Sequence, residues 1–163
     1  MGSDFYHTMI LPYAGIIIKI CRAYTNCQED FEDYYQEVCL QIWRSHEHFN
    51  EQCAWTTWIY KISLNVCLTY LKKQKNSSLC FTSDALPEQL IEDSRTAQDE
   101  SVHHLYLAIH QLSEIDRALI LLYLEQQPQQ TIADILGLTA NNIGVRIMRI
   151  KQRLNTLLNY EEQ

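Results

Sequence analysis

The sequence predicts an all-α protein in which two small helical domains are joined by an acidic linker. Its 163 residues contain four glycines and three prolines, too few for the closely spaced turns of a β-sandwich or barrel. The apolar residues, 47% of the chain, recur at the spacing of amphipathic helices. Residues 76–100 lack this period, contain Pro87 and are acidic, which is typical of a linker.

The first domain is predicted to cover residues 4–75. Its first helix is expected over 12–24, because Pro12 suits the first helical turn. A turn or short helix is expected over 4–10, before this helix. A second helix over 28–45 carries an apolar stripe formed by Phe31, Tyr35, Val38, Cys39 and Ile42. Another face of this second helix presents Asp33, Gln36, Glu37 and Leu40.

The third helix of this domain, over 52–74, is apolar on two sides and is predicted to be the most buried. It ends in the basic sequence YLKKQKN. Three aromatic residues near its start, Trp55, Trp58 and Tyr60, have two interpretations. They are either core residues or, beside a lysine cluster, side chains that stack on unpaired bases.

The second domain is predicted to cover residues 101–160, with helices over 101–111, 114–125, 129–136 and 140–158. The last two helices, joined by GLT, have the pattern of a helix-turn-helix. The small residue, the turn residue and the core residue that this motif needs are Ala133, Gly137 and Ile143.

The last helix of this motif has an outer face suited to nucleic acid. Thr139 is its expected N-cap. We interpret Gly144, which costs about 1 kcal/mol of helix propensity relative to alanine, as a point of close backbone approach. Polar side chains suited to a major groove and its phosphates are Asn141, Asn142, Arg146 and Arg149.

The formal net charge of −7 is distributed unevenly along the chain. Residues 28–37 and 76–100 are acidic, whereas residues 61–75 and the last helix are basic. Local basic patches are sufficient for phosphate contacts, so the acidic total does not exclude DNA binding. Solvated helix faces would give the same charge pattern.

Membrane, secretory and enzymatic classes are disfavoured. The longest apolar stretch, Met9 to Ile20, is shorter than the roughly 20 residues of a membrane span, and no basic residue precedes it as in a secretory signal. We therefore expect no membrane insertion and a cytoplasmic protein. No nucleophile with a base, catalytic carboxylate pair or phosphate-binding glycine loop is evident, so we expect neither catalysis nor a cofactor.

The six cysteines form no CxxC pair, and most fall at apolar helical positions. We interpret them as small buried hydrophobic residues. Two sets have some character of a metal site: His46, His48 and Cys53, and the pair Glu100 and His103. Each lacks the full ligand set of a known site, so we expect no bound metal and interpret these side chains as polar residues on the protein surface.

Both halves of the chain resemble a bacterial extracytoplasmic-function sigma factor, a small promoter-specificity subunit of RNA polymerase. DYYQEVCLQIW (33–43) and WTTWIYKISLNVCLTYLKK (55–73) are similar to helices of the second sigma region. LSEIDRALILLYLEQQPQQTIADILGLTANNIGVRIMRIKQRL (112–154) is similar to the fourth region. The two pieces in this order, with an acidic spacer, make the resemblance specific.

The resemblance implies a sigma factor that binds core polymerase, recognises the minus-ten and minus-thirty-five elements and assists promoter melting. It assigns core-polymerase binding to Asp33, Gln36, Glu37 and Leu40. It assigns the minus-ten element to Trp55, Trp58, Tyr60, Lys61, Asn65, Lys72 and Lys73. It assigns the minus-thirty-five element to Thr139, Asn141, Asn142, Arg146 and Arg149. The implied partners are core RNA polymerase, promoter DNA and an anti-sigma factor.

The linker over 76–100 is expected to follow a path in the polymerase that nucleic acid otherwise takes, because its acidic residues mimic the charge of nucleic acid. Four positions depart from the family pattern, namely Cys39, Leu64, Thr69 and Gly144. Two of them, Leu64 and Gly144, replace frequent basic residues on the DNA-facing helices. The alternative function is a non-catalytic helical regulatory or adaptor protein with a degenerate helix-turn-helix.

Overall fold

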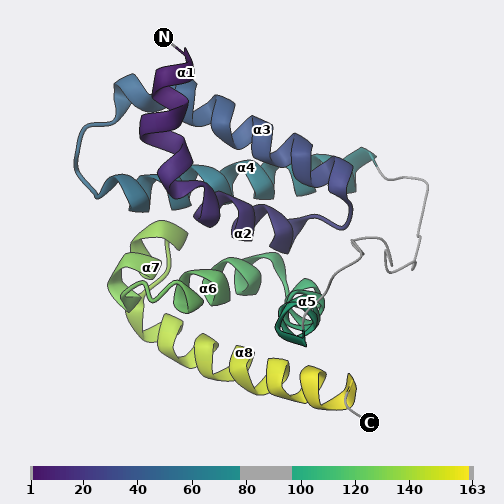
Figure 1. Ribbon diagram of the computed structural model, residues 1–163. Helices are drawn as coiled ribbons and strands as arrows, with labels where there is room; N and C mark the ends of the chain where they lie inside the picture. Colours follow the sequence, from purple (N-terminus) through teal and green to yellow (C-terminus); the bar gives the residue numbers. More distant parts are fainter. Residues whose placement is uncertain (1, 78–96, 162–163) are drawn as a thin grey trace. The chain divides into compact units, whose positions relative to one another are not determined.

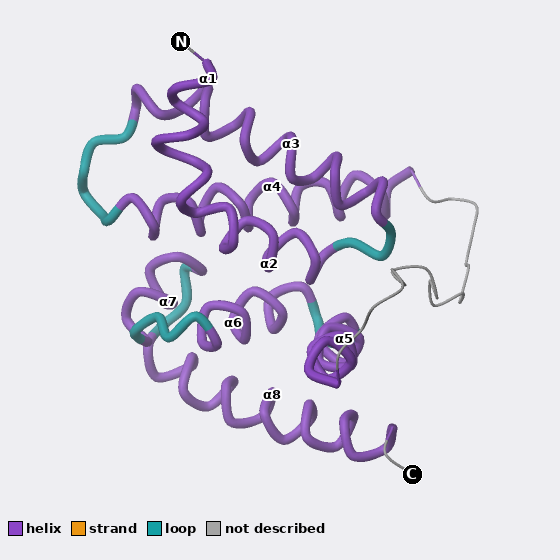
Figure 2. The backbone as a smooth tube through the Cα atoms, in the orientation of Figure 1, coloured by secondary structure: helices purple, strands orange, loops and turns teal. Residues whose placement is uncertain are grey.

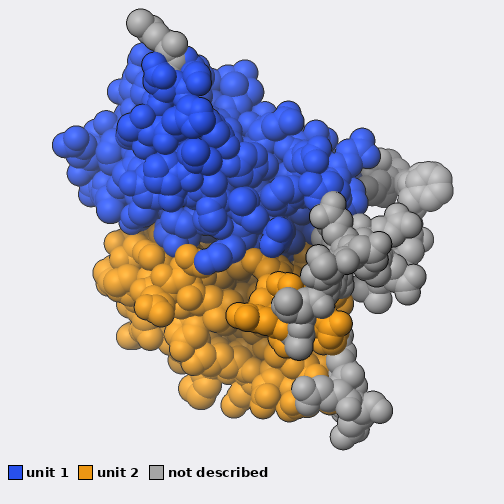
Figure 3. Space-filling view, viewed as in Figure 1, with its two compact units in different colours: residues 1–90 blue, residues 91–163 orange. Residues whose placement is uncertain are grey.

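The computed structural model describes residues 2–77 and 97–161, and all regular secondary structure within these ranges is helical (Figures 1 and 2). The all-α prediction is confirmed. The chain divides into two compact units, residues 1–90 and 91–163 (Figure 3). Most of the predicted linker, together with Cys80, lies outside the described residues.

Unit 1 begins with a continuous run of short helical segments. These are α1 (Gly2–Phe5), the π-helix η1 (Tyr6–Ile10) and the 3-10 helix η2 (Leu11–Tyr13), which leads into α2 (Ala14–Tyr24). Pro12 lies in the first turn of η2, where its missing N–H costs no hydrogen bond. The predicted helix therefore starts as a 3-10 turn before it becomes α-helical.

Three further elements complete unit 1, namely α3 (Gln28–Ser45), η3 (His46–His48) and α4 (Trp55–Ser77). The structure confirms the predicted bounds of α3. In contrast, α4 starts three residues later than predicted. Residues 51–53 form a bend before this helix. Glu51 within the bend has a left-handed backbone with φ of 58°, so the right-handed helix begins only after it.

The core of unit 1 is formed where α4 packs against both α2 and α3. Side chains of α4 are buried on two sides, as predicted for this helix. On α3 the buried stripe is Tyr34, Val38 and Ile42, whereas Tyr35 is only half-buried. The hydroxyl of Tyr35 lies 3.1 Å from that of Tyr6, so the N-terminal segment covers this side of α3.

The prediction that the cysteines are buried is confirmed for two of the five described cysteines and is wrong for Cys27, while Cys39 and Cys53 are half-buried. Cys21 and Cys67 are buried, but Cys27 is exposed. Cys27 occupies the N-cap of α3 with an extended backbone, and its Sγ accepts a hydrogen bond of 3.4 Å from the N–H of Asp30. A thiol therefore fills a capping role that serine or aspartate usually has.

Unit 2 consists of α5 (Ala97–His110), α6 (Glu114–Leu124), α7 (Gln129–Leu136) and α8 (Ala140–Glu161). α8 packs against each of the other three helices. Helix α5 begins four residues before its predicted start at residue 101, and the bounds of α7 are confirmed. Ser113 caps α6, with its hydroxyl accepting a 3.3 Å hydrogen bond from the N–H of Asp116.

The structure confirms the helix-turn-helix geometry of α7 and α8. Ala133 and Ile143 are buried, and Gly137 ends α7 in the left-handed region with φ of 69°. Thr139 directly precedes α8, and its carbonyl accepts a 3.2 Å hydrogen bond from the N–H of Ile143. The turn therefore has the residue types that its backbone requires.

For contacts within the chain, the interpretation of Gly144 as a close backbone approach is wrong. A Cβ atom at this position would meet only the far end of the Gln129 side chain, at 3.6 Å and 3.7 Å. These are ordinary van der Waals distances. Packing in unit 2 therefore does not require glycine at this position.

Candidate functional site

An acidic and apolar face follows α3 on the outside of unit 1. The four predicted residues Asp33, Gln36, Glu37 and Leu40 recur at helical spacing, so they share one side of α3. Asp33, Gln36 and Leu40 are exposed, and Glu37 is half-buried. We call these four residues the α3 face.

Tyr70 of α4 lies beside the α3 face. Burial raises the pKa of this phenol, and the nearby carboxylates of Glu37 and Asp33 raise it further. Glu37 also accepts a 2.9 Å hydrogen bond from the side-chain amide of Gln41. The carboxylates therefore lie among polar neighbours while remaining accessible from outside.

An apolar groove of about 350 Å³ continues from the α3 face. Leu40 and Trp43 are each 39% exposed along it, and the ring of Phe5 meets that of Trp43 edge-on at 5.0 Å. Trp43 was not among the predicted site residues, although it lies three residues after Leu40 on the same side of the helix. The residues that line the groove include Phe5, Tyr6, Tyr35, Gln36, Leu40 and Trp43.

An aromatic cluster lies at the start of α4. The ring centroids of Trp55 and Trp58 are 4.7 Å apart, and Phe49 meets them at 5.0 Å and 5.3 Å. The indole N–H of Trp55 donates a 3.0 Å hydrogen bond to the carbonyl of Met9. All three side chains are half-buried, so Trp55 and Trp58 are neither fully buried core residues nor fully exposed. Phe49 was not predicted, because it precedes the helix and follows no helical period.

Beyond this cluster, polar side chains follow one side of α4. Trp58, Lys61, Asn65 and Lys72 recur at helical spacing, which places them on one face. Lys61 is half-buried, whereas Asn65 and Lys72 are exposed. Lys73 is exposed on the adjoining side, with its Nζ 5.7 Å from the ring centroid of Tyr70. We call these five residues, including Lys73, the α4 face.

Tyr60 does not belong to the α4 face. Its side chain is only 3% exposed, because its position on the helix turns it toward the core. Its prediction as a DNA-facing residue is therefore wrong for this structure. Leu64 is likewise buried at 2% exposure, so the absence of a basic residue there removes no side chain from the outer surface.

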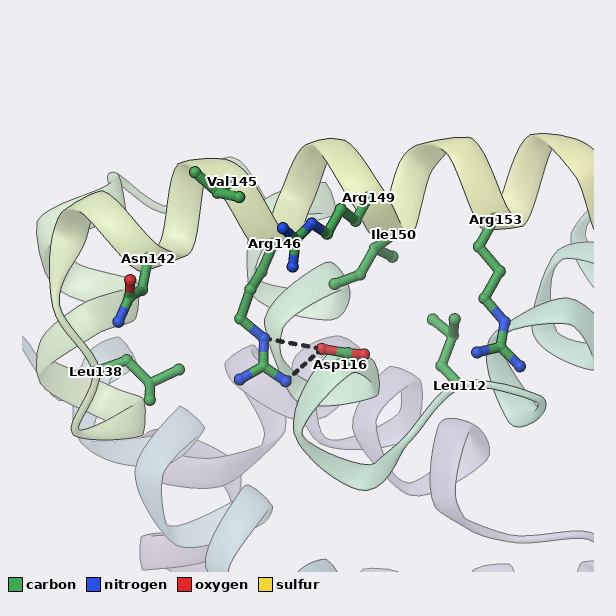
Figure 4. A pocket seen from close by; sticks show the side chains of 9 residues that line it. All are labelled: Leu112, Asp116, Leu138, Asn142, Val145, Arg146, Arg149, Ile150 and Arg153. Carbon is green, nitrogen blue, oxygen red and sulfur yellow. Dashed lines mark hydrogen bonds and ion pairs between the residues drawn. The ribbon is translucent and has the colours of Figure 1, made fainter.

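The predicted residues of unit 2 lie on the outside of α8. Thr139, Asn141, Asn142 and Arg149 are exposed, and Arg146 is half-buried. A hollow of about 570 Å³ lies between α6 and α8. Polar residues around this hollow are Asp116, Asn142, Arg146, Arg149 and Arg153, and apolar ones are Leu112, Leu138, Val145 and Ile150 (Figure 4).

Arg146 reaches across this hollow to Asp116 of α6. Its Nη2 and Nε donate hydrogen bonds of 2.7 Å and 3.1 Å to the same Oδ1 atom (Figure 4). Nearby, Arg153 donates a 3.2 Å hydrogen bond to the carbonyl of Gln111. Asp116 was not predicted as a site residue, because no helical spacing relates residues on two different helices.

The earlier metal candidates do not form a ligand cluster. Within residues 2–77 and 97–161, no three His, Cys, Asp or Glu side chains are grouped as a metal site requires. The ring of His46 instead packs against Phe5 and Trp43, at 4.5 Å and 5.3 Å between centroids. Among the described helices, none has both the length and the apolar character needed to cross a membrane.

Two protein-family models match the chain, one in each unit. Residues 9–77 match Sigma-70 region 2, and residues 104–154 match Sigma-70 region 4. The α3 and α4 faces lie in the first match, and the helix-turn-helix lies in the second. The two matches occur in the order that the sequence motifs predicted.

Individual relatives agree with this assignment. Over 68 residues the chain is 32% identical to the ECF RNA polymerase sigma factor SigG of Mycobacterium tuberculosis, which is 42% of this chain but 18% of SigG. It is 25% identical to the ECF sigma factor SigX of Bacillus subtilis, over 90% of this chain and 79% of SigX.

A solved structure has the same fold. It is the sigma factor RpoE of Bartonella quintana in complex with the anti-sigma factor NepR, with a TM-score of 0.77, 19% identity and coverage of 96% of this chain and 97% of the other. The family matches, the relatives and the fold are consistent with one another. The chain belongs to the extracytoplasmic-function (ECF) family of RNA polymerase sigma factors.

Proposed function

We propose that this protein is a promoter-specificity subunit that directs transcription initiation by core RNA polymerase. The observation that carries this proposal is the presence, in one chain, of an accessible acidic and apolar face in the region 2 match and a basic helix-turn-helix in the region 4 match. The first surface suits a protein partner, and the second suits duplex DNA.

Core polymerase binding is assigned to the α3 face. Its carboxylates would orient a basic surface of the polymerase, while Leu40 and the adjoining groove with Trp43 would bury apolar side chains of the partner. Aromatic residues near the centre of an interface commonly contribute most of its binding energy. This combination explains why apolar side chains remain exposed beside two acids.

The minus-ten element is assigned to the α4 face. Lys61, Lys72 and Lys73 would contact phosphates, and Asn65 would hydrogen-bond to a base edge. The partly exposed aromatic cluster offers a rigid ring surface on which an unpaired base can stack. Tyr60 has no role in this assignment.

The minus-thirty-five element is assigned to the start of α8. Asn141 and Asn142 have amides that can pair with adenine edges, and Arg149 can contact guanine or phosphate. Thr139 lies at the N-cap, beside the backbone N–H groups of the first turn. Arg146 would contribute a phosphate contact once its bond to Asp116 is exchanged.

Promoter opening in this scheme uses binding energy and no catalysis by this chain. Unstacking costs a few kcal/mol per base step, and contacts to the upstream duplex and the downstream single strand would offset that cost. The polymerase supplies the chemistry of RNA synthesis, and the chain needs no cofactor. The proposed site of action is the cytoplasm, with an anti-sigma factor as an additional partner.

Co-elution with core RNA polymerase tests the proposal. The full chain and an Asp33→Lys/Glu37→Lys variant are each mixed with core polymerase at moderate salt and separated by size. A matched control, Glu47→Lys/Glu51→Lys, makes the same charge change at exposed residues outside α3. We expect co-elution of the wild type and the control, and loss of co-elution for the α3 variant.

Two results would contradict the proposal. If the folded wild-type chain does not co-elute with core polymerase, the alternative of a regulatory or adaptor protein is favoured. If the α3 variant co-elutes as well as the control, the polymerase docks elsewhere on the chain. Circular dichroism of each variant establishes that the helices are intact.

A further inference from the structure

Two exposed apolar side chains lie on the outer side of α8. Val145 is 46% exposed and Met148 is 57% exposed. The opposite side of α8 carries the core residues Ile143, Ile147 and Ile150. Burial in unit 2 therefore does not explain why these two outward positions are apolar.

Val145 lies among the residues assigned to DNA. It follows Asn142 by three positions and precedes Arg149 by four, so the three side chains share one face of α8. All three line the hollow between α6 and α8 (Figure 4). Met148 does not line this hollow, which makes it an internal comparison for Val145.

The major groove of DNA offers one apolar group that a side chain such as Val145 could contact. Among the base edges exposed there, only thymine presents a methyl group, whereas the other groups donate or accept hydrogen bonds. The branched side chain of valine has few rotamers, so it can present its methyl groups at little entropic cost. An asparagine and an arginine on either side would hold the helix in register over the neighbouring bases and phosphates.

We infer that Val145 is a specificity-determining residue that contacts the 5-methyl group of a thymine in the upstream promoter element. The inference rests on the proposed function, because it needs α8 to lie in a major groove. It adds a base preference that the polar residues of the same face do not supply. Burying one methyl-sized group corresponds to about fourfold in affinity.

The test replaces thymine by uracil, which removes only the methyl group. Holoenzyme assembled from the full chain and core polymerase first selects bound fragments from a pool randomised in the upstream element. In a selected duplex each thymine is then replaced singly by deoxyuridine, and binding is measured for the wild type, Val145→Ala and the matched control Met148→Ala. The fold of each variant is checked by circular dichroism.

We expect one uracil substitution to weaken binding of the wild type and of Met148→Ala about fourfold. Val145→Ala should bind the thymine duplex more weakly and should not distinguish it from the uracil duplex. Equal binding of all uracil duplexes by the wild type would overturn the inference while leaving the proposed function intact.

Other outcomes are also distinct. If no sequence is selected by an assembled holoenzyme, the minus-thirty-five assignment fails together with the inference. If Val145→Ala weakens assembly with the polymerase and still distinguishes thymine from uracil, Val145 contacts protein instead of DNA.

Discussion

Arg146 and Asp116 form an ion pair that connects α8 to α6 within unit 2. Two guanidinium nitrogens, at 2.7 Å and 3.1 Å, share one carboxylate oxygen. The side chains of Arg146 and Asp116 are 36% and 25% exposed, so water and salt screen the pair, and its contribution to stability is about 1 kcal/mol or less. Its larger effect is to neutralise one positive charge on the face assigned to DNA.

Asp116→Asn should therefore increase non-specific DNA binding. Without the carboxylate, Arg146 can contact a phosphate, and each added phosphate contact steepens the dependence of log affinity on log salt by about 0.9. Fluorescence anisotropy with a labelled duplex over a range of KCl measures this slope. Asp134→Asn, at an exposed residue of α7, is the charge-matched control. An equal increase for both variants would show only the loss of general negative charge.

The two glycines of the helix-turn-helix should respond oppositely to alanine. Gly144→Ala should stabilise unit 2 by up to about 1 kcal/mol, because alanine favours the helix and a Cβ there meets no backbone. Gly137→Ala should destabilise it by about 1–2 kcal/mol, because its φ of 69° is unfavourable for a residue with a Cβ. Thermal unfolding measures both, at about 4–8 °C per kcal/mol for a small domain. A lower melting temperature for Gly144→Ala would reveal a constraint on that glycine.

Serine should cap the N-terminus of α3 better than Cys27 does. A thiol is a weak hydrogen-bond acceptor, and its bond to the N–H of Asp30 is long at 3.4 Å. Cys27→Ser should increase the free energy of unfolding by about 0.5 kcal/mol, and Cys27→Ala should lower it by about 0.5–1 kcal/mol. Urea unfolding of unit 1 followed by tryptophan fluorescence checks both. The capping explanation would be wrong if serine and alanine had the same effect.

Trp43 should contribute to polymerase binding through the groove beside the α3 face. Trp43→Ala removes a 39% exposed ring and should weaken association with core polymerase about tenfold or more, as expected of an interface tryptophan. Leu11→Ala is the control, since Leu11 is 46% exposed and does not line the groove. Titration of labelled chain with core polymerase gives both affinities. Equal affinities for the two variants would remove the groove from the proposed interface.

Features that are determined within one helix or turn could be predicted from the sequence. The bounds of α3, the turn at Gly137 and the common side of Asp33 and Glu37 follow from local spacing and backbone preference. Spacing could also have excluded Tyr60, because Trp58, Lys61, Asn65 and Lys72 recur together and Tyr60 does not. That error came from grouping aromatic residues by type instead of by helix face.

Features made by two distant segments could not be predicted in this way. The Arg146–Asp116 pair joins residues 30 positions apart, and the groove beside α3 requires the N-terminal Phe5 to meet Trp43. Both depend on tertiary packing, which periodicity does not describe. The left-handed backbone of Glu51 before α4 is uncommon for glutamate, so residue preference did not predict it.

Stability should decrease in alkaline solution, in part because of Cys39. Burial is the main reason that the pKa of this thiol rises from 9.0 to about 11. Between these values the unfolded chain loses the thiol proton while the folded chain keeps it, so the contribution of Cys39 is complete below pH 9 and is lost as the pH rises toward 11. Urea unfolding between pH 8 and 11 should show this loss, and Cys39→Ser should show less of it.

The raised pKa of Cys39 also predicts that iodoacetamide modifies Cys39 more slowly at pH 8 than the exposed Cys27, which peptide mapping can measure. Equal rates at pH 8 would contradict the assigned burial of Cys39.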